Sequence, residues 1–247
     1  MGLPFIDPYQ PRFPPPELAL DEPNGLLAFG GNLGPETLLT AYRQGIFPWY
    51  SAGQPILWWS PDPRAVLVPG AIHVSRSLAK AIRRPGYHIR VDTVFATVVE
   101  ACAAPRGHDS GTWILPEMIS AYQRLHELGY AHSIEYWLNG ELAGGLYGVA
   151  IGAVFCAESM FSRAPNASKI VLAHLSRGLA AGGFTLIDCQ FETLHLQSMG
   201  AVTVSRRRYL EHLRAPAAHQ WPATAISARI EPPIQDSDAV HDPRYHS

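Results

Sequence analysis

An aspartate and a glutamine in one apolar segment have the residue types and the spacing that acid–base chemistry requires. Asp188 and Gln190 lie in the run 184–190, and residues two apart on a strand share a face, so we expect both side chains to point the same way. A carboxylate in an apolar run is costly unless it is paired or hydrogen-bonded. Asp188 therefore either holds a loop in place, the usual role of a lone aspartate, or is oriented by Gln190 to act on a reacting amine or hydroxyl.

A second acid, Glu158, lies in another apolar strand-like segment, 155–162. Two acids in neighbouring segments could share one site and perturb each other's ionisation. Their charge would also suit a cationic acceptor, such as a peptide that bears Arg or Lys. The alternative is an ion pair between Glu158 and a basic residue such as Arg163, and the segment by itself favours neither interpretation.

Tryptophans form a third group of candidates, namely Trp49, Trp58, Trp59 and Trp113. Aromatic rings stack on unpaired nucleic-acid bases, and such a contact contributes about 1–3 kcal/mol per base. Core packing is the commoner role of any single tryptophan. Because Trp58 and Trp59 are adjacent, we expect at most one of them to face a ligand.

A basic stripe is predicted along a helix spanning 76–84. Its members are Arg76, Lys80, Arg83 and Arg84. They are spaced i, i+4, i+7 and i+8 and share one face, whereas Leu78 and Ile82 fall on the other side. Such a stripe is usually only the solvated face of a helix, but residues 63–91 contain no acidic side chain to balance this one. Phosphate binding is therefore the favoured interpretation.

The elements that position these groups divide into two domains and a tail. Residues 1–62, rich in Pro and Trp, are interpreted as a small loop-rich N-terminal domain, 63–215 as the second domain, and 216–247 as a tail that is disordered at least over 234–247. Helices are predicted to begin at or just after Pro35, Ser75, Asp92, Pro116 and Asn166. Strands are predicted at 87–91, on both sides of Asn139–Gly140, beyond Gly152 and at 184–190. Adjacent hairpins make the sheet largely antiparallel and the fold class α+β, or mixed α/β.

Composition excludes several classes of protein. The 247 residues are 47% hydrophobic and 16% charged, an ordinary globular composition, and no apolar run is long enough to span a bilayer. No secretion signal begins the chain, so a cytoplasmic protein is expected. Three cysteines, odd in number and far apart, predict buried reduced thiols, and without zinc spacing no metal is expected. A net charge of −2 means that any RNA contact must come from a local patch.

Several blocks of rare residues follow one another in order. They are 22–28 (EPNGLLA), 45–49 (GIFPW), 57–64 (LWWSPDPR), 111–114 (GTWI), 132–135 (HSIE), 158–162 (ESMFS), 186–190 (LIDCQ) and 195–201 (HLQSMGA). In these blocks the chain, from about Pro23 to about Leu213, resembles the leucyl/phenylalanyl-tRNA–protein transferase family. So many rare blocks in one order argue against chance agreement.

The resemblance implies a two-domain protein whose C-terminal domain is similar to the acetyltransferase fold. It implies transfer of Leu or Phe, and less readily Met, from aminoacyl-tRNA to proteins that begin with Arg or Lys, which marks them for N-end rule degradation. No cofactor is implied, because the tRNA ester is already activated. We expect a monomer with no membrane partner.

The family's motifs also assign roles to residues of this chain. The resemblance assigns the catalytic role to Asp188, Gln190 and Glu158, and the contacts with the terminal adenosine to Trp49 and Trp113. It assigns tRNA binding to the basic stripe. The acyl pocket is formed, by the same resemblance, by Leu146, Phe155, Met160, Leu172 and Ile187. Two departures stand out, since Ala157 replaces a usual Gly and Leu146 a commoner Met. Both would reshape the pocket and leave the preference between Leu and Phe open.

Two other classes of protein share parts of this pattern. An acetyl-CoA-dependent N-acetyltransferase carries an Arg/Gln-x-x-Gly-x-Gly/Ala loop that binds pyrophosphate at a helix N-terminus, and no such run precedes the helix at Asn166. A non-enzymatic RNA- or peptide-binding adaptor could use the basic stripe and the tryptophans. It gives no reason to bury both Glu158 and Asp188.

Overall fold

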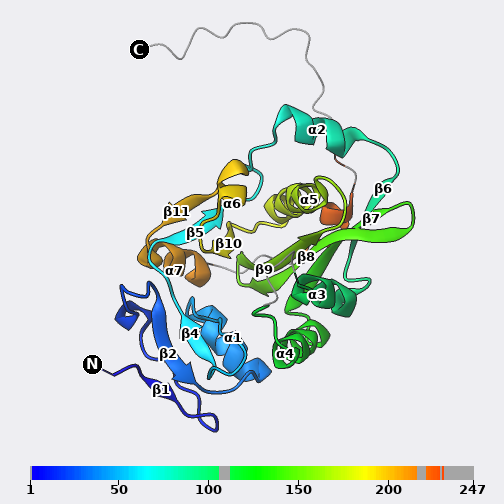
Figure 1. The fold of residues 1–247 in the computed structure, drawn as a ribbon. Helices are drawn as coiled ribbons and strands as arrows, with labels where there is room; N and C mark the ends of the chain where they lie inside the picture. Colours follow the sequence, from blue (N-terminus) through cyan, green and yellow to red (C-terminus); the bar gives the residue numbers. More distant parts are fainter. Residues whose placement is uncertain (1, 106–111, 216–220, 229, 231–247) are drawn as a thin grey trace, which may run out of the picture.

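The computed structural model describes residues 2–105, 112–215, 221–228 and 230, and it arranges them around two β-sheets (Figure 1). The smaller sheet has the strand order β1-β2-β4-β3. Its strands are β1 (Phe5–Ile6), β2 (Leu26–Gly30), β4 (Leu57–Trp59) and β3 (Phe47–Pro48). The helix α1 (Pro35–Arg43) lies between β2 and β3 in the chain, and a short 3-10 helix spans Pro16–Leu18.

The larger sheet has the order β11-β5-β10-β9-β8-β7-β6. Its strands are β5 (Arg64–Leu67), β6 (Tyr87–Val91), β7 (Ala131–Leu138), β8 (Glu141–Ile151), β9 (Val154–Ser162), β10 (Leu186–Gln190) and β11 (Val202–Val204). Every neighbouring pair in it is antiparallel except β9 and β10, which run parallel. The expected α+β class with a largely antiparallel sheet is therefore confirmed.

Helices cover both faces of the larger sheet. On one face α5 (Ala167–Ala181) packs on β7, β8 and β9, with α2 (Arg76–Arg83) and α8 (Ala223–Ser227) beside it. On the other face α3 (Phe95–Ala103) and α4 (Pro116–Glu127) pack against the same strands. The helices α6 (Leu194–Ser198) and α7 (Arg206–Arg214), which the sequence did not predict, follow β10 and β11.

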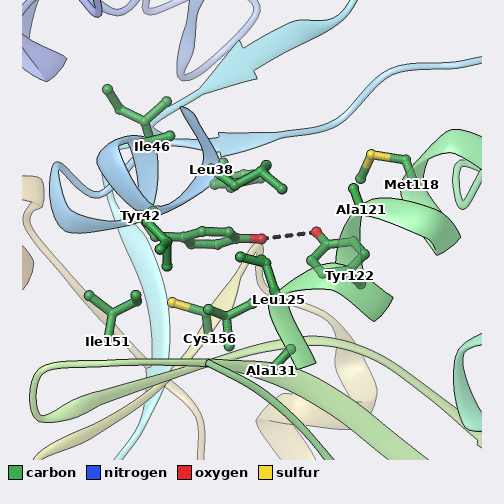
Figure 2. Close-up of a cluster of buried hydrophobic side chains, with 14 of the residues drawn as sticks. Leu38, Tyr42, Ile46, Met118, Ala121, Tyr122, Leu125, Ala131, Ile151 and Cys156 are labelled. Atoms are coloured by element: carbon green, nitrogen blue, oxygen red, sulfur yellow. Dashed lines mark hydrogen bonds between the residues drawn. The ribbon is translucent and has the colours of Figure 1, made fainter. Parts of the chain in front are cut away.

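One hydrophobic core joins the small N-terminal sheet to the larger sheet. Figure 2 shows Leu38 and Tyr42 of α1 beside Tyr122 and Leu125 of α4, above Cys156 of β9. All five residues are at most 1% exposed. A second core, on the α5 face, contains alternate residues of the same strands, because successive side chains of a strand point to opposite faces.

Local signals in the sequence set several element boundaries. The Ser75 side chain accepts a hydrogen bond from the Leu78 amide, as an N-cap should, and α2 then runs over the predicted helix. Asn139 and Gly140 both have positive φ, 53° and 84°, which is the geometry of the predicted hairpin turn. These predictions are confirmed.

Two predicted helix caps are wrong. Asp92 has φ 59° and its carboxylate accepts from the Ser133 amide, while Glu135 of β7 accepts from the two amides that precede α3, those of Thr93 and Val94. Asn166 precedes α5 as expected, but its left-handed backbone, φ 64°, leaves its side chain without a capping hydrogen bond. In both cases tertiary geometry overrides a local preference.

Part of the predicted tail is helical. Ile226 of α8 is fully buried against α5, and a Cβ at Gly178 would meet its side chain at 2.3 Å, so that position requires glycine. The prediction of disorder for 234–247 lies outside the described residues. No helix among the described residues is long and apolar enough to cross a membrane.

Candidate active site

A cavity of about 1090 Å³ opens where the two parallel strands of the larger sheet separate. The last Cα partners of β9 and β10 are Cys156 and Asp188. The residues that follow on both strands, 157–163 and 189–191, line the cavity, together with parts of α3, α5 and α6 and the segments around Trp49 and Trp113. Concave sites of this size are where ligands usually bind.

A β-bulge places Glu158 on the cavity wall. The register of β8 and β9 shifts between Tyr147 and Gly148, so that Glu158 is the extra residue between Ala157 and Ser159. Bulges commonly redirect a side chain next to an active site. Gly148 is required here by space, because a Cβ would meet the Cys156 carbonyl oxygen at 2.2 Å.

Two tyrosines hold the Glu158 carboxyl group. Tyr42 Oη lies 2.8 Å from Oε1 and Tyr122 Oη 2.8 Å from Oε2, both within hydrogen-bond distance, and the two phenol oxygens are 2.9 Å apart. Burial raises the pKa of Glu158 to about 7, and the tyrosine hydrogen bonds oppose that rise. Nearby Asp188 adds a smaller increase and Arg64 a smaller decrease in this pKa. Glu158 can therefore change its charge near neutral pH.

Asp188 forms a buried ion pair behind the cavity wall. Arg64 of β5 donates from Nε to Oδ1 at 2.8 Å and from Nη2 to Oδ2 at 2.7 Å, and both side chains are at most 1% exposed. Tyr209 Oη also donates to Oδ2 at 2.8 Å. The Arg64 guanidinium lies 4.7 Å and 4.6 Å from the ring centroids of Phe47 and Tyr209. Asp188 is thus held by side chains from β5 and α7 rather than exposed to the cavity.

Gln190 does reach the cavity. The pairing of β10 with β5 contains a second bulge, between Asp188 and Gln190, and Gln190 has a positive φ of 57°. Together they turn the Gln190 side chain away from the direction of Asp188. The expectation that these two side chains share a face is therefore wrong. They remain linked, because the Gln190 amide N–H donates to Asp188 Oδ1 at 2.9 Å. With its side-chain nitrogen toward Ala157, Gln190 also donates to that carbonyl oxygen at 3.2 Å.

Trp49 and Trp113 line the same cavity although they are far apart in the sequence. Trp49 is 40% exposed and packs on Trp59 and Phe191, with ring centroids 5.4 Å away in each case. Trp58 and Trp59 are buried in the core. The structure therefore brings together the two tryptophans that the family resemblance selected.

The five residues expected to form the acyl pocket lie together on the α5 face of the sheet. Leu146 pairs with Met160 across β8 and β9, and Phe155 pairs with Ile187 across β9 and β10. Met160 and Leu172 line the cavity. Leu146, Phe155 and Ile187 are completely buried and form a layer behind them.

The basic stripe is separate from the cavity. Arg76, Lys80, Arg83 and Arg84 are all exposed, while Leu78 and Ile82 are buried, as the spacing predicted. None of the four lines the cavity. The helix α2, which carries the first three and ends just before Arg84, lies beside α5 (Figure 1).

Several residues of the site were not predicted. Tyr42, Tyr122 and the ion-pair role of Arg64 carry no local signature, because their partners lie 36 to 124 positions away. His195 also lines the cavity, as does Arg163, which had been considered only as an ion-pair partner of Glu158. Burial, and next the charge of Lys169, lower the pKa of His195. His195 belongs to a block that had been noted only for its rarity.

Metal ligation has no candidate among the described residues, since no three His, Cys, Asp or Glu side chains are grouped so as to hold an ion. The three cysteines are buried thiols, as expected. Burial raises the pKa of Cys156 and of Cys189, which opposes thiolate chemistry in this region.

Comparison with known proteins gives concordant results. Residues 66–214 match the family described as Leucyl/phenylalanyl-tRNA protein transferase, and residues 31–62 match the N-terminal domain of that family. Proteins named Leucyl/phenylalanyl-tRNA--protein transferase are similar over most of the chain. The one from Azoarcus sp. (strain BH72) is 57% identical over 88% of this chain and 95% of its own length. The one from Chromobacterium violaceum is 56% identical over 89% of this chain and 94% of its own length. The one from Nitrosomonas europaea is 60% identical over 81% of this chain and 85% of its own length.

Two solved structures show weaker likeness. The structure of L-PGS from Bacillus licheniformis has a TM-score of 0.39 at 11% identity, covering 68% of this chain and 53% of that one. A GCN5-related N-acetyltransferase from Kribbella flavida has a TM-score of 0.36 at 10% identity, covering 70% and 61%.

Proposed function

The chain belongs to the leucyl/phenylalanyl-tRNA–protein transferase family, and from this premise we propose that it moves Leu or Phe, and less readily Met, from aminoacyl-tRNA to proteins that begin with Arg or Lys. Aminoacyl transfer from tRNA to a protein follows from the family itself. The choice of acceptor, the use of Met and the marking of acceptors for N-end rule degradation are our proposals. So are a cytoplasmic location, a monomeric state and independence of a cofactor.

The observation that carries this proposal is the composition of one cavity. It holds two tryptophans, an apolar wall, an acid and an amide within a single space. Trp49 and Trp113 suit the adenine ring at the 3′ end of a tRNA, because stacking on aromatic side chains contributes about 1–3 kcal/mol per base. The apolar wall suits an aliphatic or aromatic side chain.

The reaction joins the acceptor's α-amine to the ester carbonyl carbon of the aminoacyl-tRNA. A tetrahedral intermediate forms, and its collapse breaks the bond between the carbonyl carbon and the ribose 3′ oxygen. That oxygen leaves as the 3′ hydroxyl of the tRNA, with the proton that the amine loses. Holding both reactants in one cavity can lower the barrier by up to ~7–11 kcal/mol in favourable cases. Gln190, on the cavity wall, contacts the attacking amine. Asp188 is a positioning residue, because its Oδ1 binds the Gln190 amide while Arg64 fixes its orientation.

Amino-acid selectivity comes from the α5 face. Met160 and Leu172 contact the side chain of the transferred residue, while Leu146, Phe155 and Ile187 set how deeply it can enter. One methylene in such a pocket is worth only ~1–3 kcal/mol, so overlap among Leu, Phe and Met is expected.

Acceptor selectivity comes from Glu158, and tRNA affinity from the basic stripe. Glu158 lines the cavity and can carry a negative charge for an Arg or Lys side chain. The basic stripe on α2 is exposed and binds the phosphate backbone away from the reacting end.

A transfer assay tests this function. The purified chain is mixed with labelled Leu-, Phe- or Met-tRNA and a peptide that begins with Arg or, as a control, with Ala. We expect transfer of Leu and Phe, weaker transfer of Met, and little transfer to the Ala peptide. Binding of tRNA and peptide without transfer would indicate an adaptor, and acetylation from acetyl-CoA without use of the tRNA would indicate an acetyltransferase.

A further inference from the structure

The carboxyl group of Glu158 closes a ring of hydrogen-bond contacts with the two tyrosines. Going around it, Oε1 is 2.8 Å from Tyr42 Oη, Tyr42 Oη is 2.9 Å from Tyr122 Oη, and Tyr122 Oη is 2.8 Å from Oε2. Figure 2 shows the contact between the two phenols, inside the core that joins α1 to α4. All three separations are within the range of O–H···O hydrogen bonds.

Three such contacts need three protons, and two phenols supply only two. If Glu158 were ionised, both phenols would donate to its oxygens and the Tyr42–Tyr122 contact would have no proton. Two lone pairs would then face each other at 2.9 Å in a buried place, which is unfavourable. A protonated carboxyl group completes the ring: Oε2 donates to Tyr122, Tyr122 to Tyr42, and Tyr42 to Oε1.

We propose that Glu158 is a neutral carboxylic acid in the empty site, and that an Arg or Lys side chain of the acceptor displaces its proton to solvent when it binds. Acceptor capture is then coupled to the release of one proton. Glu158 goes from COOH to COO⁻ beside the bound cation, and both phenols turn to donate to it. This inference rests on the proposed function, in which Glu158 receives the basic acceptor residue.

The groups around Glu158 leave its carboxyl proton only moderately bound, so that the proton can be released. Tyr147 of β8 and Cys156 of β9 interact with it electrostatically, and burial raises the pKa of each, so both stay neutral. Asp188 of β10 raises the pKa of Glu158 and Arg64 of β5 lowers it, and these two residues are paired with each other. Arg163 and His195 line the same cavity. The resulting pKa of Glu158, about 7, leaves its proton removable under neutral conditions.

Tyr42 and Tyr122 are therefore positioning residues that set the protonation of Glu158. When Glu158 is ionised, both phenols donate to its carboxylate, and each of these hydrogen bonds lowers the pKa of Glu158. Removing one hydroxyl should raise that pKa by about one unit or more, given the usual strength of a hydrogen bond to a charged group.

The experiment compares acceptor peptides that differ only in side-chain charge. One begins with Arg and the other with citrulline, which has nearly the shape of Arg without its charge. Because both carry the same α-amine, the difference between them reports the side chain alone. Proton release is measured by calorimetry at pH 6 in buffers of different ionisation enthalpy, and KM for each peptide is followed from pH 5.5 to 8.5.

For the intact wild-type chain we expect nearly one proton released with the Arg peptide and none with the citrulline peptide. The ratio of the two KM values should change by up to about tenfold per pH unit below pH 7 and then level off. In Tyr42→Phe and Tyr122→Phe the midpoint should move to higher pH, and in Glu158→Gln the proton release should vanish. Thermal unfolding of each variant identifies any that fails to fold.

Wild-type protein that transfers Leu with a preference for Arg, yet releases no proton and shows a pH-independent KM ratio, would overturn the inference alone. An unmoved midpoint in a folded tyrosine variant would do the same. Failure to transfer to any peptide would instead remove the proposed function on which the inference rests.

Discussion

Replacing Arg64 by Met tests how the ion pair behind the cavity supports the site. Arg64 and Asp188 are at most 1% exposed and share two hydrogen bonds of 2.8 and 2.7 Å. In Arg64→Met the carboxylate of Asp188 stays buried with only Tyr209 and the Gln190 amide as donors. Removing one partner of such a pair usually destabilises a protein by about 3–5 kcal/mol, because the other charge is left uncompensated.

That loss is a large part of a typical stability of about 5–15 kcal/mol. For a chain of this length it corresponds to a fall in Tm of roughly 6–20 °C, at about 2–4 °C per kcal/mol. Urea unfolding followed by circular dichroism gives the free energy directly. Arg207→Met is the matched control, because Arg207 is 89% exposed and its Nη1 is 4.0 Å from Glu211, so its loss should change stability by less than about 0.5 kcal/mol.

A second substitution separates loss of charge balance from loss of packing. In Arg64→Met with Asp188→Asn neither member of the pair carries a charge, so part of the stability lost in Arg64→Met should return. If the double variant were as unstable as the sum of the two single variants, the uncompensated carboxylate would not be the cause. The reasoning would also be refuted if Arg64→Met unfolded at the wild-type temperature.

Three further predictions concern the cavity and α2. Because the pKa of Glu158 is raised from 4.5 to about 7 in the folded chain, the free energy of unfolding should fall as pH rises through that interval, and Glu158→Gln should flatten this dependence in urea titrations. Trp49→Ala and Trp113→Ala should each weaken binding of Leu-tRNA by about 1–3 kcal/mol in a filter assay, whereas replacement of the 92% exposed Tyr9 should not. Lys80→Gln should reduce by about one the slope of log Kd for tRNA against log salt concentration.

Each of these has a clear contrary result. An unchanged pH dependence in Glu158→Gln would show that another group causes it. Equal effects of the Trp49 and Tyr9 substitutions would indicate general destabilisation rather than stacking. An unaltered salt slope in Lys80→Gln would remove α2 from the tRNA contact.

The amino-acid sequence by itself determined the features that depend on neighbouring residues. The cap at Ser75, the turn at Asn139–Gly140 and the two-sided pattern of Leu78 and Ile82 are all local, and the structure reproduces them. The order of the rare blocks was sufficient to identify the family, and the comparisons with relatives confirm that identification. It also selected Trp49 and Trp113, which meet in one cavity.

Only the tertiary structure decided how the two acids are used. Glu158 meets tyrosines 116 and 36 positions away, and Asp188 meets Arg64 across 124 positions, so no short pattern could reveal these partners. The bulges in β9 and β10 are equally invisible to periodicity. One extra residue changes the face on which every following side chain lies, and this is why Gln190 faces the cavity while Asp188 lies behind it.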